Sequence, residues 1–295
     1  MKKVVSIALF GDATRKDGSG QNYHAYLQTF VLAHANLFPR EQGWALHVHI
    51  DDTTLAGEYG RILARMKYEG LLELATMGAA VLTHSMLWRM APVFEPGIDY
   101  VFCRDIDCIP MPRDRAVCDV FIASNCAAGV IHDSSSHTGI MGGLCHFQTA
   151  AFKNATKLSS LDDLYMFAAK SEREWAQHGT DQHVLNRLID RPDGPTLLEH
   201  RYNGWHAGPG KYPARKAGVY RCRSWSSPMP DKGKSWFSHE AQMQMSQPPV
   251  LSLLEQADLL ANHLGAAGYE IERARAFWEQ HGDPTITKLV KECES

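Results

Sequence analysis

The chain has 295 residues, of which 44% are hydrophobic and 21% are charged, and it carries a formal net charge of −3. This size and composition are typical of a globular protein with one large core, either a single domain or a domain with a small appendage. The small net charge excludes a general attraction to nucleic acid or to anionic membranes, although local patches can differ from the average.

Neither a membrane span nor a targeting segment is expected from the sequence. No run of about 18 apolar residues occurs, which a transmembrane helix would need. The apolar run after Lys2 and Lys3 ends at Gly11; it is too short for a signal peptide and fits a first buried strand. The seven cysteines contain no C-x-x-C pair. We therefore expect reduced thiols in a cytoplasmic protein, not a zinc site or a disulfide framework.

The first part of the chain alternates short apolar runs with stretches of helical spacing. The predicted strands are 4–10, 44–52, 79–84, the apolar run that begins at Tyr100, and 119–125. The predicted helices between them are 23–37, 61–75 and 86–94. This alternation predicts an α/β fold, with a mainly parallel sheet that helices cover on both faces.

The second part of the chain reads differently. Helical spacing continues over 159–179 and 181–190, and residues 200–249 are then rich in Gly, Pro, Trp and Tyr without a clear period. Such composition favours functional loops. Pro248-Pro249 marks a boundary, and helical spacing resumes beyond it. We therefore expect one large domain over 1–247 and a small C-terminal helical appendage over 248–295.

Acidic residues follow several of the predicted strands: Asp12, the pair Asp51-Asp52, and the D-x-D motif of Asp105 and Asp107. Ligands of parallel sheets bind beyond the carboxyl ends of the strands. Two carboxylates this close either stay solvated, share a proton or hold a cation such as Mg²⁺ or Mn²⁺.

Two other kinds of phosphate chemistry are weighed against a metal site. In a phosphohydrolase of the haloacid dehalogenase type, the first Asp of D-x-D is a nucleophile and the second a general acid. In that class the motif normally continues with a small residue and Thr or Val, and it lies near the start of the chain. Here Cys108-Ile109-Pro110 follows the two acids, at mid-chain. The segments that end in Gly210-Lys211 and Gly233-Lys234-Ser235 lack the first glycine of a P-loop.

Four segments together resemble a known family. WRMAPVF, a strand and RDIDCIP resemble the D-x-D region of GT-A fold glycosyltransferases, which use nucleotide-sugar donors. GTDQHVLNRLI (179–189) resembles the D-Q-x-x-L-N element of the retaining family 8 glycosyltransferases, and YNGWHAGPGKYP (202–213) resembles that family's Asn followed by H-x-G-x-x-K-P-W. HTGIMGGLCHF (137–147) is a looser match to its G-V-L-L strand. The resemblance covers about residues 1–215. Arg104 before the first Asp, and Tyr212-Pro213 after Lys211, depart from the family pattern.

The resemblance implies a GT-A (Rossmann-like) fold and a set of site residues. It implies that Asp105, Asp107 and His206 bind Mn²⁺ or Mg²⁺ and that Lys211 contacts the donor diphosphate. Arg89 would reach the sugar or the phosphates, and Asp12 the base or the ribose. Asp181 and Gln182 would lie by the reactive carbon of the sugar. Arg104 is expected to add a further cation at the donor. The alternatives are ordinary ones: a loop histidine, surface cations, a turn residue at Asp12 and a helix N-cap at Asp181.

The implied reaction is transfer of a sugar, with retention, from a nucleotide sugar, expected to be UDP-linked, to a hydroxyl acceptor. Between Glu199 and Asp231 the chain has six Lys or Arg, no acid, and several Tyr and Trp. This composition fits a donor diphosphate pocket with a sugar-stacking platform, and hence a glycan acceptor. It also fits a polyanionic acceptor such as a phosphorylated glycan or a hydroxymethylated base in DNA. A phosphohydrolase and a non-catalytic nucleotide- or glycan-binding domain are the competing classes.

Overall fold

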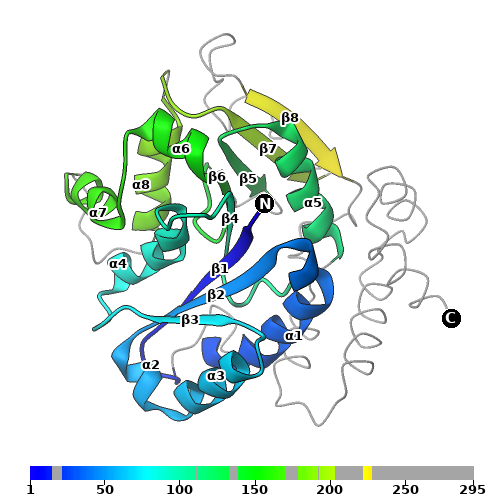
Figure 1. Cartoon of the computed structure of the whole chain (residues 1–295). Coiled ribbons are helices and arrows are strands. Elements are labelled where there is room, and N and C mark those ends of the chain that lie inside the picture. The colour runs from blue at the N-terminus through cyan, green and yellow to red at the C-terminus, as the bar shows by residue number, and fades with distance from the viewer. Residues whose placement is uncertain are drawn as a thin grey trace, which may run out of the picture.

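The computed structural model describes residues 1–14, 22–110, 112–132, 139–170, 179–191, 193–202 and 222–227. Within them the strands form one eight-stranded sheet, in the order β3-β2-β1-β4-β6-β5-β7-β8, and helices lie on both of its sides (Figure 1). β6 runs antiparallel to both of its neighbours, and the other neighbouring pairs are parallel. The predicted fold class, a mostly parallel α/β sheet flanked by helices, is confirmed.

The strands are short and mostly buried. They are β1 (Lys3–Leu9), β2 (Trp44–Ile50), β3 (Glu73–Thr76), β4 (Tyr100–Arg104), β5 (Ala128–His132), β6 (Leu144–Gln148), β7 (Leu197–Tyr202) and β8 (Cys222–Ser227). The α-helices are α1 (Leu27–Leu37), α2 (Asp52–Ala56), α3 (Glu58–Tyr68), α4 (Leu82–Leu87), α5 (Pro112–Ser124), α6 (Thr149–Thr156), α7 (Leu161–Ala169) and α8 (Thr180–Ile189). The 3-10 helices among the described residues are η1 (Tyr23–Tyr26), η2 (Arg40–Gln42) and η3 (Trp88–Val93).

In the described part of the chain, a large hydrophobic core on each face of the sheet holds the helices to it. Alternate side chains of a strand point to opposite faces, so Val5 and Ile7 of β1 join one core while Val4 joins the other. The first core packs the sheet against α1, α3 and α5. The second packs it against α4, η3, α6, α7 and α8. Because η3 and α8 share this second face, residues far apart in the sequence meet there.

The predicted boundaries are wrong around 61–84. The structure ends α3 at Tyr68, places β3 at Glu73–Thr76, and makes 82–87 the helix α4 instead of a strand. Gly70 has φ 76°, a left-handed conformation that stops the helix. β3 lies at the edge of the sheet, and its Glu73 and Thr76 are exposed. A half-exposed edge strand lacks the continuous apolar run of a buried one. The predicted helix 61–75 therefore extends the helical spacing of the preceding residues into β3.

Residues 119–125 are also not a strand, because 119–124 form the C-terminal half of α5. Val117, Cys118 and Phe121 are buried, which is the i, i+1, i+4 spacing of one helical face. Pro112, the first residue of the helix, is favoured at that position because its fixed φ suits a helix start. The strand at this point of the chain is β5, which the sequence analysis missed along with α6.

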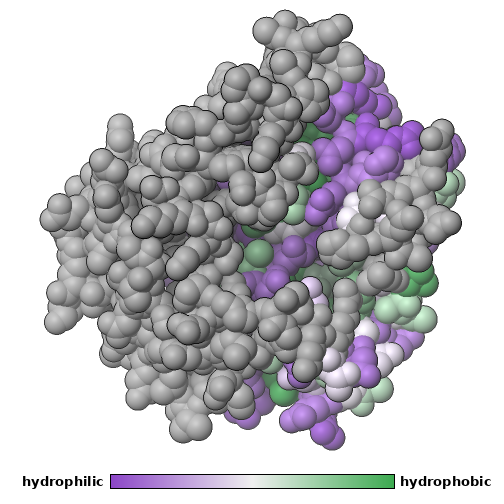
Figure 2. Space-filling view, turned by 180° about the vertical axis from the view of Figure 1, so that it is seen from behind, coloured by the Kyte–Doolittle hydropathy of each residue, from purple (hydrophilic) through white to green (hydrophobic). Residues whose placement is uncertain are grey.

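The described surface carries few large hydrophobic side chains. On the face shown in Figure 2 the described residues in view are mainly hydrophilic, with smaller hydrophobic areas between them. The exposed large hydrophobic residues lie on separate elements and are Met1, Leu55, Tyr68, Val81 and Met166. Within the described ranges no helix has the length and apolar character to cross a membrane. The predicted appendage and its boundary at 248 lie outside the described residues.

Buried histidines make the fold sensitive to acid. Burial lowers the pKa of His34 to about 3, and burial, with a smaller contribution from His47, lowers that of His49 to about 3. An unfolded chain binds these protons at a pKa of about 6.5. Their contribution to stability is therefore complete above pH 6.5 and is lost as the pH falls toward 3.

We expect the free energy of unfolding to fall by roughly 4 kcal/mol from these two residues between pH 7 and pH 5. Urea denaturation at the two pH values measures the change. In His34→Gln the decrease should be smaller by about 2 kcal/mol, because the contribution of one buried imidazole is gone. Equal stability of the wild type at pH 5 and pH 7 would contradict the expectation.

Candidate active site

The loops after β1 and β2 are tied to one another by Asp51. Its carboxylate accepts hydrogen bonds from the Gly11 N–H (3.0 Å) and from the Thr54 N–H (2.9 Å), and it caps α2. Asp51 is buried. The acid at the end of β2 therefore has a structural role and is not available to a ligand.

Arg89 lies at the centre of a charged cluster that joins three distant segments. Its guanidinium forms an ion pair with Asp105 Oδ1, directly after β4, and a second with Asp181 Oδ2 of α8 at 3.0 Å. The Arg89 Nε–H donates to the Met86 carbonyl at 2.8 Å. The side chain of Arg89 is only 3% exposed and that of Asp181 only 5%. Three residues that the resemblance assigned to the site are thus in direct contact.

The electrostatics of this cluster keep Arg89 charged. Burial opposes the charged guanidinium, but the carboxylates of Asp105 and Asp181 outweigh that effect, so the pKa of Arg89 is raised. One cation here is shared by two carboxylates, so the three groups together keep a net negative charge. Asp181 is not the helix N-cap, since Gly179 holds that position without a side-chain bond. The first turn of α8 instead directs Asp181 at Arg89.

Two consecutive glycines allow the backbone to approach both carboxylates. A Cβ atom added to Gly142 would collide with Asp181 Oδ2, and one added to Gly143 would collide with the carboxylate of Asp105. The Asp105 N–H donates to the Gly143 carbonyl at 3.3 Å. The segment 137–147 was expected only as a loose match to a strand, although adjacent glycines signal a close approach of the backbone to other groups.

Asp105, Asp107 and Cys108 form a group that could hold a metal ion. Their ligand atoms all lie within 4.8 Å of one another. The two carboxylates suit Mg²⁺ or Mn²⁺, whereas a thiol is a softer ligand. The donor set of the D-x-D motif therefore fits the expected ion. His206 and Lys211, the other residues expected at the metal and the diphosphate, lie outside the described residues.

Arg104 is used inside the protein and not at this cluster. Its Nε lies 3.2 Å from both carboxylate oxygens of Asp114 on α5, and an Nη–H donates to the Cys103 carbonyl at 2.8 Å. Arg104 is 1% exposed. Successive strand residues face opposite sides, so Arg104 meets α5 while Asp105 meets η3. The expected donor contact of Arg104 is therefore replaced by a structural ion pair.

Asp12 and Gln182 lie near strand and helix ends, as expected. The Asp12 carboxylate accepts the Thr14 N–H at 2.7 Å. The backbone hydrogen bond from Thr14 is the largest cause that lowers the pKa of Asp12. Gln182 is half-buried in the first turn of α8, next to Asp181. Asp12 therefore makes the hydrogen bond of an ordinary turn residue. Its side chain is also exposed, so it could contact a ligand.

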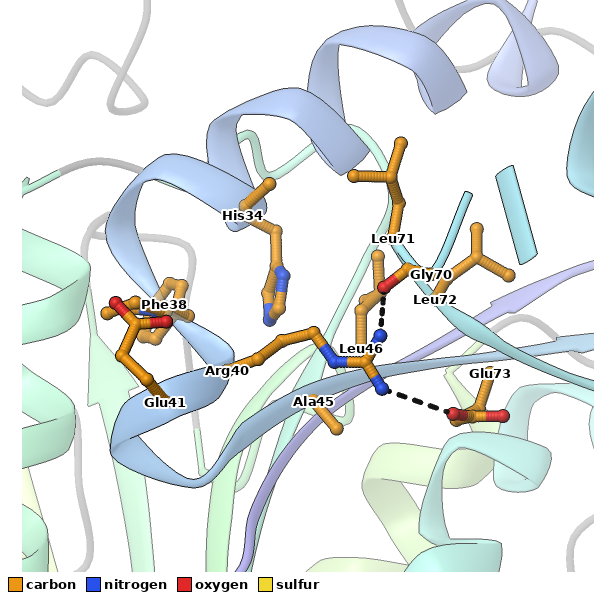
Figure 3. Close-up of a pocket in the computed structure, with 12 residues that line it drawn as sticks. His34, Phe38, Arg40, Glu41, Ala45, Leu46, Gly70, Leu71, Leu72 and Glu73 are labelled. Carbon is orange, nitrogen blue, oxygen red and sulfur yellow. Dashed lines mark hydrogen bonds and ion pairs between the residues drawn. The ribbon is translucent and has the colours of Figure 1, made fainter. Parts of the chain in front are cut away.

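A pocket of about 290 Å³ lies elsewhere and is not part of the candidate site (Figure 3). It is lined by the end of α1, by Ala45 and Leu46 near the start of β2, and by Glu73 at the start of β3. These strand starts form the amino-terminal edge of the parallel sheet. The Arg89 cluster lies beyond the carboxyl end of β4, which is the opposite edge.

Comparisons with known proteins give only distant likenesses. Neither protein-family models nor curated proteins match the chain. Among solved structures, a chain from Desulfovibrio desulfuricans G20 named as a nucleotide-diphospho-sugar transferase has a TM-score of 0.43 and 15% identity, over 68% of this chain and 80% of its own. The 4-diphosphocytidyl-2C-methyl-D-erythritol synthase of Anaerococcus prevotii has a TM-score of 0.42 and 10% identity, over 67% and 86%. S. aureus TarS 1–349 in complex with UDP has a TM-score of 0.38 and 10% identity, over 95% and 72%. At these scores the likenesses carry no argument, and the site rests on its own geometry.

Proposed function

We propose that the chain is a metal-dependent glycosyltransferase that moves a sugar, with retention, from a nucleotide sugar to a hydroxyl acceptor. One observation carries the proposal. A buried guanidinium joins the first Asp of D-x-D to the Asp of the D-Q element, at the carboxyl end of a parallel strand. These three residues are far apart in the sequence, and the fold brings them together. A site for a sugar diphosphate needs a cation, metal ligands and polar groups in one place.

The residues present suit a donor diphosphate and its metal. Asp105 and Asp107, with His206, would hold Mn²⁺ or Mg²⁺, and the bound ion would act as a Lewis acid on the leaving diphosphate. Lys211 would add a fixed positive charge for the same leaving group. We assign a UDP-linked donor, with Asp12 at its base or ribose.

The side chains of α8 and η3 would act on the sugar. Arg89 holds Asp105 and Asp181 in fixed positions and presents a permanent positive charge beside them. Asp181 and Gln182 would lie by the reactive carbon. Gln182 is uncharged and a poor nucleophile, which favours approach of the acceptor from the leaving-group face over a covalent intermediate on Gln182.

The geometry disfavours a phosphohydrolase of the haloacid dehalogenase type. There Asp105 would have to be a free nucleophile, but one of its oxygens is paired with Arg89 and its carboxylate lies against Gly143.

For the acceptor we favour a glycan, with a hydroxymethylated DNA base as the alternative. The residues that would bind the acceptor, 200–231, lie largely outside the described ranges. Acceptor affinity that falls steeply with salt would favour the polyanionic alternative.

Binding of UDP with Mn²⁺ tests the metal role. We expect the pair to raise the midpoint of thermal unfolding of the wild type, since a ligand that binds only the folded state stabilises it. Asp105→Asn and Asp107→Asn should lose that shift, and transfer should fall by roughly 100-fold or more. Asp52→Asn is the matched control, because Asp52 is an exposed acid at the start of α2, just after the end of β2. An unimpaired Asp105→Asn would remove the metal role.

The reaction class is tested by a panel of nucleotide sugars assayed for donor hydrolysis. A glycosyltransferase releases the nucleoside diphosphate from one or a few of them. A phosphohydrolase would instead release phosphate from simple esters without any acceptor. A binding module would bind the nucleotide and consume no donor.

A further inference from the structure

We propose that Asn186 is a positioning residue for the transfer reaction. It holds the backbone segment 139–143, here called the diglycine loop, against Asp105 and Asp181. This inference rests on the proposed function, because only that function makes the position of the two carboxylates matter for turnover. Asn186 contacts neither carboxylate in any hydrogen bond described for it, so it would act through the loop.

The side chain of Asn186 connects the diglycine loop to α8 directly. Its Oδ1 accepts the Ile140 N–H at 3.0 Å, and its Nδ2 donates to the Gln182 carbonyl at 2.7 Å. Gly139, with φ 80°, lies so close that an added Cβ would collide with the Asn186 amide. An amide side chain offers an acceptor and a donor on two separate atoms, as these two hydrogen bonds require. Asn186 therefore ties the loop to the helical turn that carries Asp181 and Gln182.

Further hydrogen bonds hold the diglycine loop, and one of them comes from Asp105 itself. The His132 Nε2 lies 2.8 Å from the Gly139 carbonyl, and because a carbonyl only accepts, this nitrogen carries the proton. Cys145 Sγ donates to the Gly142 carbonyl at 3.3 Å, and the Asp105 N–H donates to the Gly143 carbonyl at 3.3 Å. The loop is thus held at 139 and 140 from one end and at 142 and 143 from the other.

This anchoring determines where the carboxylates can be. Gly142 and Gly143 leave no room for even one methyl group beside Asp181 and Asp105. A loop released at Ile140 can withdraw from that contact, so the carboxylates can leave the positions in which Arg89 holds them. Displacement of reacting groups by about 1 Å can cost about 100-fold in rate. Asn186 would thereby affect turnover without touching donor or metal.

The first measurement tests the anchor and does not depend on the function. In Asn186→Ala the Ile140 N–H loses its acceptor, so we expect hydrogen exchange at Ile140 to accelerate by about tenfold or more. Asn154→Ala is the control, because Asn154 is an exposed asparagine on α6. Unchanged exchange at Ile140 in Asn186→Ala would overturn the inference.

The second measurement tests the consequence for the reaction. We expect Asn186→Ala to lower kcat by about 10- to 100-fold for release of UDP from UDP-glucose, UDP-galactose or UDP-N-acetylglucosamine, whichever the wild type consumes fastest. The Kd of UDP with Mn²⁺ should change by less than about threefold. In Asn186→Asp the loop acceptor remains, so exchange at Ile140 should stay near the wild-type rate and kcat should fall less than in Asn186→Ala.

The outcomes separate this inference from the proposed function. Faster exchange at Ile140 with an unchanged kcat per folded molecule would overturn the positioning role. A wild type that neither binds UDP with Mn²⁺ nor consumes any nucleotide sugar would overturn the proposed function, and with it the role in transfer. Faster exchange at Ile140, a lower kcat per folded molecule and a near-constant Kd together support the inference. Simple destabilisation would lower the fraction of folded molecules and leave the kcat of each folded molecule unchanged.

Discussion

Arg89→Ala is expected to lower the free energy of unfolding by about 3–5 kcal/mol, because it leaves buried carboxylate charge without its cation. Asp181 is nearly inaccessible to water, and both carboxylates that meet Arg89 lose their counter-charge together. The same change should abolish transfer, since the two acids would separate. Urea denaturation and a donor-consumption assay measure the two effects.

A matched arginine separates this effect from loss of an ordinary ion pair. Arg65 pairs with Glu69 at 2.8 Å, one helical turn away, and its side chain is 82% exposed. Pairs of this kind contribute about 0.3–0.5 kcal/mol, so Arg65→Ala should have a small effect. An Arg89→Ala variant no less stable than Arg65→Ala would show that the cluster is not formed as described.

A double variant tests the cause of the loss. If the unpaired charge of Asp181 dominates the cost, then Arg89→Met with Asp181→Asn should recover a large part of the stability lost in Arg89→Met alone. Activity should stay absent in the double variant. Arg89→Lys keeps one charge but lacks the planar fork that bridges two carboxylates, and we expect an intermediate stability.

Only part of this cluster could be predicted from the sequence. Strand ends could be predicted where the strand is almost entirely buried, as in β1, β2 and β4. Asp105 was therefore placed correctly at the carboxyl end of β4. No local pattern relates Arg89 to Asp181, because their contact is created when η3 and α8 pack on the same face of the sheet. The resemblance assigned both residues to the site, but it could not give their ion pairs.

The position of Arg104 away from the cluster could have been predicted from the strand alone. Neighbouring strand residues point to opposite faces, and this alternation alone argues against the expectation that Arg104 and Asp105 serve the same ligand. The partner, Asp114, lies ten residues later on α5. It could not be foreseen while 119–125 was interpreted as a strand, because that interpretation removed the helix on which Asp114 lies.

Gly143→Ala is expected to have the largest effect on transfer of any single-methyl change in the described part of the chain. The added Cβ would collide with the Asp105 carboxylate, which is held on its other side by Arg89 and cannot yield without breaking that ion pair. Gly143 does not have the positive φ that strains an alanine, so the effect comes from the collision alone. We expect kcat/KM to fall by about 100-fold and the free energy of unfolding by about 1–3 kcal/mol.

Gly142→Ala provides the contrast within the same loop, because its Cβ would collide with Asp181 instead of Asp105. If Asp105 holds the metal and Asp181 serves the sugar, then Gly143→Ala should weaken binding of UDP with Mn²⁺, whereas Gly142→Ala should lower kcat with a smaller change in that Kd. Gly57→Ala is the control, since its nearest atoms would lie at an ordinary 3.5 Å. Equal effects of the two loop variants on nucleotide binding and on kcat would contradict separate roles for the two carboxylates. A wild-type-like Gly143→Ala would show that the loop does not press on Asp105.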